Sequence, residues 1–485
     1  MKTSTNPWIT ALISIMLSAF FVLINSDSTS PFFLNHGLDS SIFQYMGFAI
    51  TKGKIPYTDL FDHKGLLLYW LNSAGYLLSS SWGVCLLQIL SLSVTICLWY
   101  KLLEGDRPEW LKWAVIILSL LALYAYYDNG NMTEEWSLPF ISYPFVIYCH
   151  NLKRGSNRFT QSQLIFIGLC MGCLALMRVN NMSPIVGLLL YCLIVAMKRK
   201  EYGYLACSIG IIASSACLPL LLAIGYMGTI GGVQGIRDMF FATITFNMEY
   251  SVGRNNLLLF NLWNNIRYIY KALLPIIFLL PVISRERTIA LPLLLSFLSA
   301  VVSTGGGRNF HYLMIFIPLL VVSFSCLRNT RFCYLTLLLT TIIYGKTLLR
   351  QFDADHFRFP LKDERYEAFA KVISPIPPSE RNKVWNMGGG FLVQYFTKAD
   401  MVQTNRLLLP FQLRISPALH HTEVGCLQRR KPEYVIVADY HEDWMCDAIS
   451  FSKADEEPFI KEHYELIASS CWEDGTQLFC YRRRQ

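Results

Sequence analysis

Long apolar segments separated by short polar ones occupy the first 350 residues of the chain. A helix that crosses a lipid bilayer needs about 20 mostly apolar residues, with a lower limit near 17. Apolar segments near this length predict eleven crossings, at 7–26, 84–102, 111–127, 136–150, 163–178, 182–197, 205–227, 266–283, 288–304, 312–327 and 332–349. Lys2 before the first segment would also suit a signal peptide, but no small-residue cleavage site follows. We therefore expect this helix to remain as an anchor.

After residue 349 the pattern changes to short segments of helical or strand periodicity. ERYEAFAKVIS predicts a helix, NKVWNMGG a strand that runs into a turn, and PEYVIVADY a second strand. YELIASSCWEDGTQLFCYRR predicts a β-hairpin with Asp-Gly near its turn. The sequence thus predicts a polytopic α-helical membrane domain over 1–349 and a small α/β domain over 350–485.

Composition supports this division. The chain is 53% hydrophobic and 16% charged, as expected for a polytopic membrane protein. Residues 350–485 hold 38 of the 76 Asp, Glu, Lys and Arg residues, which suits a water-facing domain. The net charge of +8 comes from loops between apolar segments, so it reports membrane topology and not a nucleic-acid partner.

The distribution of Lys and Arg predicts the orientation. Alternate loops at 101–112, 151–163, 198–204, 284–287 and 328–331 hold 13 Lys and Arg in 40 residues. The other set, at 27–83, 128–135, 178–181, 228–262 and 305–311, holds 7 in 111 residues. Positively charged loops stay in the cytoplasm. Eleven crossings from a cytoplasmic N-terminus then place the C-terminal domain on the extracytoplasmic side.

The first outer loop carries more chemistry than a connector needs. Its segments SIFQYMGFAI and GLLLYWLNSAGYLL read as helices lying in the membrane interface. Between them, GKIPYTDLFDHKG has the Gly and Pro residues of a fixed loop. Further acidic residues fall in other outer loops: Asp128, Glu134 and Glu135 in DNGNMTEEW, then Asp238 and Glu249 in the 228–262 loop. The outer face is therefore the predicted location of the functional site.

This arrangement resembles the GT-C glycosyltransferases, integral membrane enzymes that use polyprenyl-phosphate sugars. The group includes protein O-mannosyltransferase-like and lipid A aminoarabinose transferase-like proteins. The resemblance lies in an Asp after the first helix followed by G-x-[IL]-P-Y-x-D-x-x-D-x-K-[GP], and in the later segments TEEW, LMRVNN and GRNFHYLMIFIPLL. One departure is HGLDSS around Asp39, where these enzymes commonly have an Asp-Glu pair.

The resemblance implies roles for individual residues. Asp39 maps to the base that takes the proton of the acceptor hydroxyl. Cationic candidates for the donor phosphate are Lys64, Arg178, Arg308 and His311, since such side chains bind phosphate through charge-assisted hydrogen bonds. Substrate-positioning candidates are Asp59, Asp62, Glu134 and Glu135.

Each acidic candidate also has a structural interpretation. Asp39 could cap a helix that starts near Ser40. Asp59 and Asp62 could form a turn beside Pro56 and Tyr57. Glu134 and Glu135 could cap the helix at 136.

The cationic candidate Arg178 has a structural interpretation as well, because an arginine at a helix end can extend its head to the membrane interface. An arginine at an outer helix end runs against the positive-inside bias, however, and that favours function.

Other ligand sites have weaker signals. His36, Asp39, Asp62 and His63 are metal-ligand types without a recognised spacing, so no metal is assigned and a divalent cation stays a minor alternative. GGGRNF lacks the Lys and Ser or Thr of a nucleotide-binding P-loop. Cys426, Cys446, Cys471 and Cys480 lie in the domain placed outside the cytoplasm, where one or two disulfides would be expected.

The predicted function is an inverting transfer of one sugar from a polyprenyl phosphate to a glycan, lipid or protein acceptor. The expected location is a bacterial inner membrane, with the chemistry on the extracytoplasmic side. Transport is disfavoured because the centres of the spans are nearly uncharged. A lipid-linked polysaccharide polymerase or ligase and a non-catalytic assembly subunit remain the alternatives.

Overall fold

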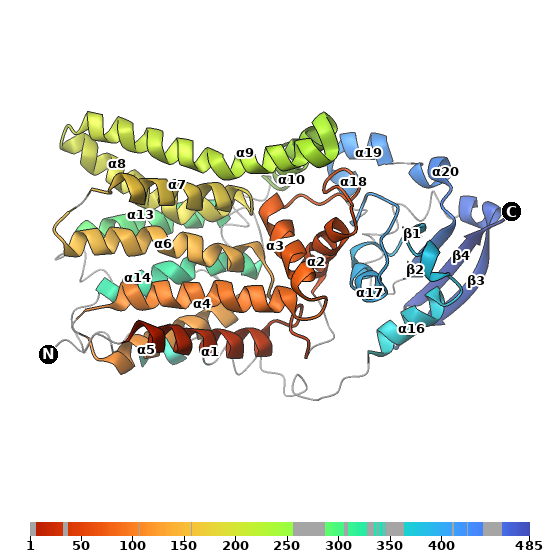
Figure 1. The fold of residues 1–485 in the computed structure, drawn as a ribbon, viewed down its shortest axis with the longest axis horizontal. Coiled ribbons are helices and arrows are strands. Elements are labelled where there is room, and N and C mark those ends of the chain that lie inside the picture. Colours follow the sequence, from red (N-terminus) through yellow and green to blue (C-terminus); the bar gives the residue numbers. More distant parts are fainter. Residues whose placement is uncertain are drawn as a thin grey trace.

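The fold consists of a long bundle of helices with a small β-sheet at one end (Figure 1). This computed structural model describes residues 6–32, 37–105, 107–156, 158–255, 287–304, 309–326, 363–409, 412–423, 425–439 and 458–485, with scattered positions between 334 and 345. The predicted domain boundary at 349–350 lies outside the described residues.

Apolar helices make up the bundle. In chain order they are α1 (Pro7–Asn25), α2 (Leu38–Thr51), α3 (Leu66–Leu78), α4 (Gly83–Leu103), α5 (Glu109–Tyr124), α6 (Thr133–Lys153), α7 (Gln161–Ala175), η1 (Val179–Met182), α8 (Ser183–Lys198), α9 (Tyr202–Phe240), η2 (Phe241–Thr245), α10 (Phe246–Asn255), α13 (Arg287–Thr304), η3 (Phe310–Phe316) and α14 (Ile317–Cys326). Neighbouring helices pack as α1 on α4, α4 on α6, α7 on α9 and α8 on α13.

Four of the described helical segments are long and apolar enough to cross a membrane: Pro7–Asn25, Gly83–Leu102, Val179–Lys198 and Tyr202–Tyr250. Shorter apolar helices lie beside them, so the chain is built as a multi-pass membrane protein. The predicted number of eleven crossings is not confirmed. The predicted span at 266–283 and most of the one at 332–349 lie outside the described residues.

The predicted outer loop at 228–262 is wrong over its described part, which is helical. α9 continues to Phe240, and η2 and α10 extend the helical segment to Asn255. A break occurs at Gly232, whose φ of 59° lies in the left-handed region that glycine tolerates. α10 at the end of this segment is amphipathic. A polar, amphipathic helix looks like a loop when only hydropathy is considered.

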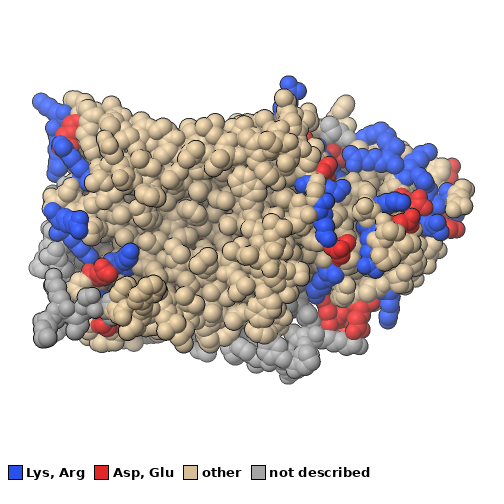
Figure 2. Space-filling model, viewed as in Figure 1, with Lys and Arg blue, Asp and Glu red and all other residues tan. Residues whose placement is uncertain are grey.

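Charge is concentrated at the two ends of the molecule. Figure 2 shows Lys and Arg at the end of the bundle away from the sheet, mixed charges at the sheet end, and a broad face without charge between them. Such an uncharged belt is what a lipid bilayer requires of a protein surface.

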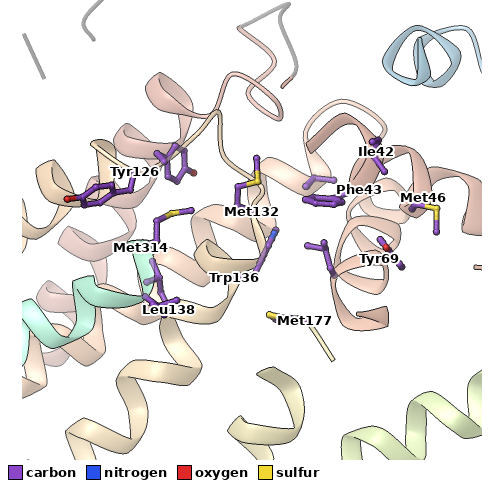
Figure 3. Packing of buried hydrophobic residues seen from close by; sticks show 14 of the residues in the cluster. Ile42, Phe43, Met46, Tyr69, Tyr126, Met132, Trp136, Leu138, Met177 and Met314 are labelled. Carbon is purple, nitrogen blue, oxygen red and sulfur yellow. The ribbon is translucent and has the colours of Figure 1, made fainter. Parts of the chain in front are cut away.

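Helices α2 and α3 lie between the bundle and the sheet, confirming the two helices expected in the 27–83 segment (Figure 1). Figure 3 shows Phe43 and Tyr69 from these helices in the same region of the core as Met132 and Trp136. All four side chains are almost fully buried. The first long loop of the chain is thus anchored by hydrophobic packing, which fixes the segment between the two helices.

The C-terminal sheet has the strand order β1-β2-β4-β3, with β1 (Val384–Asn386), β2 (Tyr434–Asp439), β3 (Tyr464–Cys471) and β4 (Gln477–Arg483). β1 runs parallel to β2, and the other pairs are antiparallel. Shorter helices accompany it: α16 (Glu364–Ile373), η5 (Pro378–Glu380), η6 (Gly389–Phe391), α17 (Val393–Lys398), α18 (Gln412–Ile415), α19 (Pro417–Glu423) and α20 (Cys426–Arg430). The predicted helix, strands and hairpin are confirmed.

The expected disulfides do not form among the described cysteines. No disulfide joins Cys426, Cys471 and Cys480 to one another, and Cys446 lies outside the described residues. Cys426 packs in the hydrophobic cluster with Trp385 and Val435, whereas Cys480 belongs to the main core cluster. The two thiols therefore lie on different sides of the sheet.

Candidate functional site

The segment between α2 and α3 is a tight loop built by its own side chains. The Asp59 Oδ2 atom accepts a hydrogen bond from the Ile55 backbone N–H at 2.8 Å, and the Asp59 N–H donates to the Ile55 carbonyl at 2.9 Å. Tyr57 adopts a φ of 65° within this turn. Asp59 thus stabilises the turn, in agreement with its structural interpretation.

Asp62, His63 and Lys64 form a row of adjacent polar side chains at the end of this loop. The Lys64 ammonium donates to His63 Nε2 at 3.0 Å, and His63 Nδ1 lies 3.3 Å from Asp62 Oδ1, at ion-pair distance but poorly aligned for a hydrogen bond. Because Lys64 has no acceptor, His63 must be neutral at Nε2. The loop therefore presents one cation held by its own neighbours.

Two buried tyrosines fix this row. The Tyr69 hydroxyl donates to Asp62 Oδ2 at 2.6 Å and accepts from the Lys64 backbone N–H at 3.2 Å. The Tyr57 hydroxyl donates to the Lys64 carbonyl at 2.9 Å. The sequence predicted neither tyrosine as a site residue. Tyr69 follows Asp62 by seven residues, across the start of α3, and this short spacing allows the contact. Asp62 is therefore held by its own loop and α3, and it positions other residues.

Electrostatics keep the row charged at both ends. Burial opposes ionisation of Asp62, but His63 and Lys64 outweigh it and hold the pKa of this carboxyl below its ordinary value. Burial likewise disfavours the Lys64 cation, while the carboxylates of Asp62 and Asp39 raise the pKa of its ammonium. The charged form of Lys64 is thus favoured by its acidic neighbours although the side chain is partly buried.

Asp39 lies in the first turn of α2, with Gly37 as the N-cap residue. It does not cap the helix, so that structural interpretation is wrong. Its carboxylate takes no hydrogen bond or ion pair from any group in the described part of the chain, yet its charge acts on the pKa of both His63 and Lys64. Asp39 is therefore a carboxylate within electrostatic range of Lys64 with its acceptor capacity unused.

Arg178 lies just after α7, as the N-cap residue of η1, and is paired with Glu134. The Arg178 Nη1 atom donates to Glu134 Oε1 at 2.6 Å, and the guanidinium stacks on the Tyr312 ring, 3.6 Å from its centroid. Arg178 and Tyr312 both contribute to the electrostatics of Lys64. The structure thus brings Arg178, Glu134 and Lys64 into one charged cluster, which the chain separates by up to 114 positions.

His311 comes to the same cluster from η3. Its Nδ1 lies 2.7 Å from Asp128 Oδ2, and its ring contacts Tyr312 edge-on at 4.7 Å. Asp128 begins a run of left-handed residues through Asn129, Gly130 and Asn131. His311 is buried, so in this structure it serves the 128–131 loop directly.

Glu135 does not take part in this cluster. Its carboxylate accepts from Gln88 Nε2 at 3.0 and 2.9 Å, from the Tyr127 hydroxyl at 2.6 Å and from the Asn131 N–H at 2.7 Å. The group is buried and satisfied on every side. Glu135 therefore anchors the 128–131 loop and has a structural role. Its neighbour Glu134 belongs to the charged cluster of the candidate site.

Two further predictions concern a phosphate ligand and a metal. Arg308 and His36 lie outside the described residues. Within the part that the structure describes, no three His, Cys, Asp or Glu side chains group closely enough to hold a metal ion.

Helix α10 covers the loop from the other side, which sequence reasoning missed. The Asn247 amide donates to the His63 carbonyl at 3.0 Å, and the His63 ring lies 5.4 Å from Phe246 and 5.5 Å from Tyr250. The aromatic residues at 246 and 250, one helical turn apart, were the available signal.

Known proteins share this architecture. The chain is similar to an oligosaccharyltransferase of Archaeoglobus fulgidus, solved in complex with Zn and sulfate, with a TM-score of 0.52 and 12% identity over 98% of this chain and 73% of that one. It is also similar to ArnT from Cupriavidus metallidurans in the apo state, with a TM-score of 0.53 and 11% identity over 98% and 97%. Both are GT-C glycosyltransferases, and at these identities the likeness shows the fold.

Sequence comparison gives the family. No curated protein matches the chain significantly. Residues 3–263, more than half of the chain, match the family model described as the competence-induced protein Ccs4 N-terminal domain. The chain therefore belongs to the competence-induced Ccs4 family, and it has the GT-C fold that its first loop predicted.

Proposed function

We propose that this protein is a membrane glycosyltransferase that moves a sugar from a polyprenyl-phosphate donor to a glycan, lipid or protein acceptor. The GT-C fold supports the general class. The observation that carries the proposal is Asp39, a carboxylate without a hydrogen-bond partner among the described residues, in electrostatic range of Lys64. An unpaired carboxylate beside a fixed cation suits a reaction that releases a proton and an anion together.

In the proposed step, the acceptor hydroxyl attacks the anomeric carbon of the donor sugar. A new C–O bond forms as the bond from that carbon to the phosphate oxygen breaks, with inversion at carbon. Asp39 takes the hydroxyl proton, acting as general base. The departing polyprenyl phosphate keeps the electron pair, and its added negative charge is balanced by Lys64 and Arg178.

The remaining residues hold these groups in place. Asp62 and His63 fix the Lys64 ammonium, and Glu134 with Tyr312 fixes the Arg178 guanidinium. A preorganised cation needs no rearrangement as charge develops on the phosphate, which is why such groups lower the barrier. Arg308 and His311 are the further donor-phosphate candidates, and Asp59 and Glu135 act through the loops they stabilise.

The proposed location is the inner membrane of a bacterium, with Asp39 and the C-terminal sheet on the extracytoplasmic side. Two features support it: the Lys and Arg at the opposite end of the bundle (Figure 2), and the helix pair α2–α3 between bundle and sheet. The basic end suits the cytoplasm.

The test is transfer from radiolabelled polyprenyl-phosphate sugars in membranes that carry wild type, Asp39→Asn or Asp474→Asn at equal abundance. Asp474 lies in the β3–β4 turn and serves as the matched control. We expect Asp39→Asn to lose at least about 100-fold in rate, the usual contribution of a general base, and Asp474→Asn to lose nothing. Equal transfer by Asp39→Asn would remove it as the base. Absence of transfer in wild type would favour the polymerase or the assembly subunit.

A further inference from the structure

A pocket of about 550 Å³ lies at the junction between α2, the end of α3 and α17. Its size falls within the range of small-molecule sites in proteins. None of Asp39, Lys64 and Arg178 lines it. On α2, the lining residues Ser41, Gln44 and Phe48 share one helical face, whereas Asp39 and Phe43, the ring under Lys64, share another. The pocket is therefore distinct from the candidate site.

The lining is rich in neutral hydroxyl and amide groups. Most of its residues are Ser, Thr or Gln, and Phe48 and Tyr76 supply aromatic surface, with ring centroids 5.7 Å apart. A hydroxyl both donates and accepts, as do the hydroxyls of a sugar. An aromatic ring offers the flat apolar surface on which the C–H face of a sugar can lie.

The described lining of the pocket has no net charge. Its single cation, Lys398, is paired with Asp363, and its single carboxylate, Asp400, is paired with Lys52 at 2.6 Å. An anionic ligand such as a phosphate would need an uncompensated cation in the lining. Charge therefore favours an uncharged ligand.

One polar group in the lining points to a ligand more directly. The Gln394 Oε1 atom is buried and has no hydrogen-bond partner in the described part of the chain. A buried acceptor without a partner is costly and rare in folded proteins. A turn of the Gln394 amide toward the pocket would let a ligand hydroxyl satisfy it.

The opposite wall is held rigid before any ligand binds. Gln44 Nε2 donates to the Ser28 carbonyl at 2.7 Å. The Thr29 hydroxyl donates to Gln88, whose amide bonds Glu135 at 2.9 Å. A lining fixed in advance loses less entropy on binding. This chain of contacts also connects the pocket to the 128–131 loop.

We propose that this pocket binds an uncharged saccharide. The binding site stands on the pocket itself, and assigning the saccharide to the acceptor rests on the proposed function. The acceptor would then be a glycan or a glycosylated molecule, and the C-terminal region would contribute to its recognition through Gln394 and Thr397 of α17.

The test is saturation-transfer NMR on the full chain in nanodiscs, with maltotriose, cellotriose, mannotriose and chitotriose as neutral probes and trigalacturonate as the charged comparison. Gln394→Leu removes the unpaired amide at similar volume, and Ser81→Trp fills the pocket from its exposed rim. Gln428→Leu, exposed on α20, is the matched control. We expect a neutral probe to bind, and both pocket variants to weaken it about tenfold, the value of one lost hydrogen bond or more.

The proposal would be overturned if Ser81→Trp left binding of the neutral probe unchanged. It would also be overturned if trigalacturonate bound preferentially or if no neutral probe bound. No donor is present in this assay, so its outcome is independent of transfer. If Asp39→Asn retains full transfer but the neutral probe binds and responds to both variants, the proposed base fails and the saccharide pocket stands.

Discussion

The Arg406 guanidinium donates from Nε to the Tyr57 carbonyl at 2.9 Å, across 349 positions of sequence. The same side chain lies 3.6 Å from Asp238 of α9 and 3.3 Å from Glu423, over the ring of Phe61. One residue of the C-terminal region thus ties together the α2–α3 loop and the long helix. The loop that carries Lys64 is therefore positioned from outside the bundle.

Arg406→Gln should loosen this loop. The variant leaves two carboxylates without their cation and removes a charge-assisted hydrogen bond, so we expect a loss of about 3 kcal/mol in unfolding free energy. Thermal unfolding in detergent measures it, and proteolysis should cut the 52–65 loop faster. Arg484→Gln, an exposed arginine near the C-terminus, is the control. Equal stability of the two variants would show that Arg406 does not hold the loop.

His63 should make stability depend on pH. Burial first, then the charge of Lys64, holds the pKa of His63 below its ordinary value of 6.5. The unfolded chain then takes up this proton at higher pH than the folded chain does. The stabilisation from neutral His63 is complete above about pH 6.5 and is lost as the pH falls through the lower, folded value.

The measurement is the melting temperature of wild type and His63→Asn between about pH 5 and 7.5. Asn cannot take up a proton, so the variant should lose stability less steeply toward low pH than wild type. Asp62 does not confuse the result, because its lowered pKa places its own loss of stability below the ordinary carboxyl value of 3.8. Parallel curves for the two proteins would contradict the prediction.

The Glu134–Arg178 pair should show strong coupling. Glu134 is buried, so Arg178→Met leaves an unpaired carboxylate and should cost about 3–5 kcal/mol. Adding Glu134→Gln removes that charge, and the double variant should be more stable than Arg178→Met alone. A double-mutant cycle by thermal unfolding measures the coupling. The exposed pair Arg158–Glu201 is the matched control and should show little. Additive effects at 134 and 178 would mean that the pair is not formed.

Gly130 should tolerate no side chain. Its φ is +80°, and a Cβ there would meet the Ser26 hydroxyl and lie 2.9 Å from the Tyr127 ring. Gly53 has a similar φ of +83° and open space around it. Gly53→Ala should cost about 1 kcal/mol from backbone strain alone. Gly130→Ala should cost about 2–4 kcal/mol because overpacking is added. Equal melting temperatures of the two variants would show that the 128–131 loop shifts to accommodate the added methyl group.

Several features could be predicted because they depend on local pattern. The apolar segments predicted the helices of the bundle, and the alternation after residue 380 predicted β1, β2 and the β3–β4 hairpin. The motif from Gly53 to Gly65 identified the loop that holds Lys64. Predictions failed where a partner from elsewhere decides the outcome: the amphipathic α10 reads as a loop until it packs on His63.

The sequence by itself determined the residue types available to the site: acids after the first helix, a lysine in the loop, an arginine at the end of α7. Only the tertiary structure decided their roles. Asp59 accepts a hydrogen bond within its own turn, and Glu135 accepts from Gln88 and Tyr127. Glu134 forms an ion pair with Arg178, while the Asp39 carboxylate has no hydrogen-bond partner among the described residues. The physical reason is that a carboxylate's role follows from which donors reach it. The donors that separate Glu134 from Glu135, Arg178 and Gln88, come from elements more than 40 positions away.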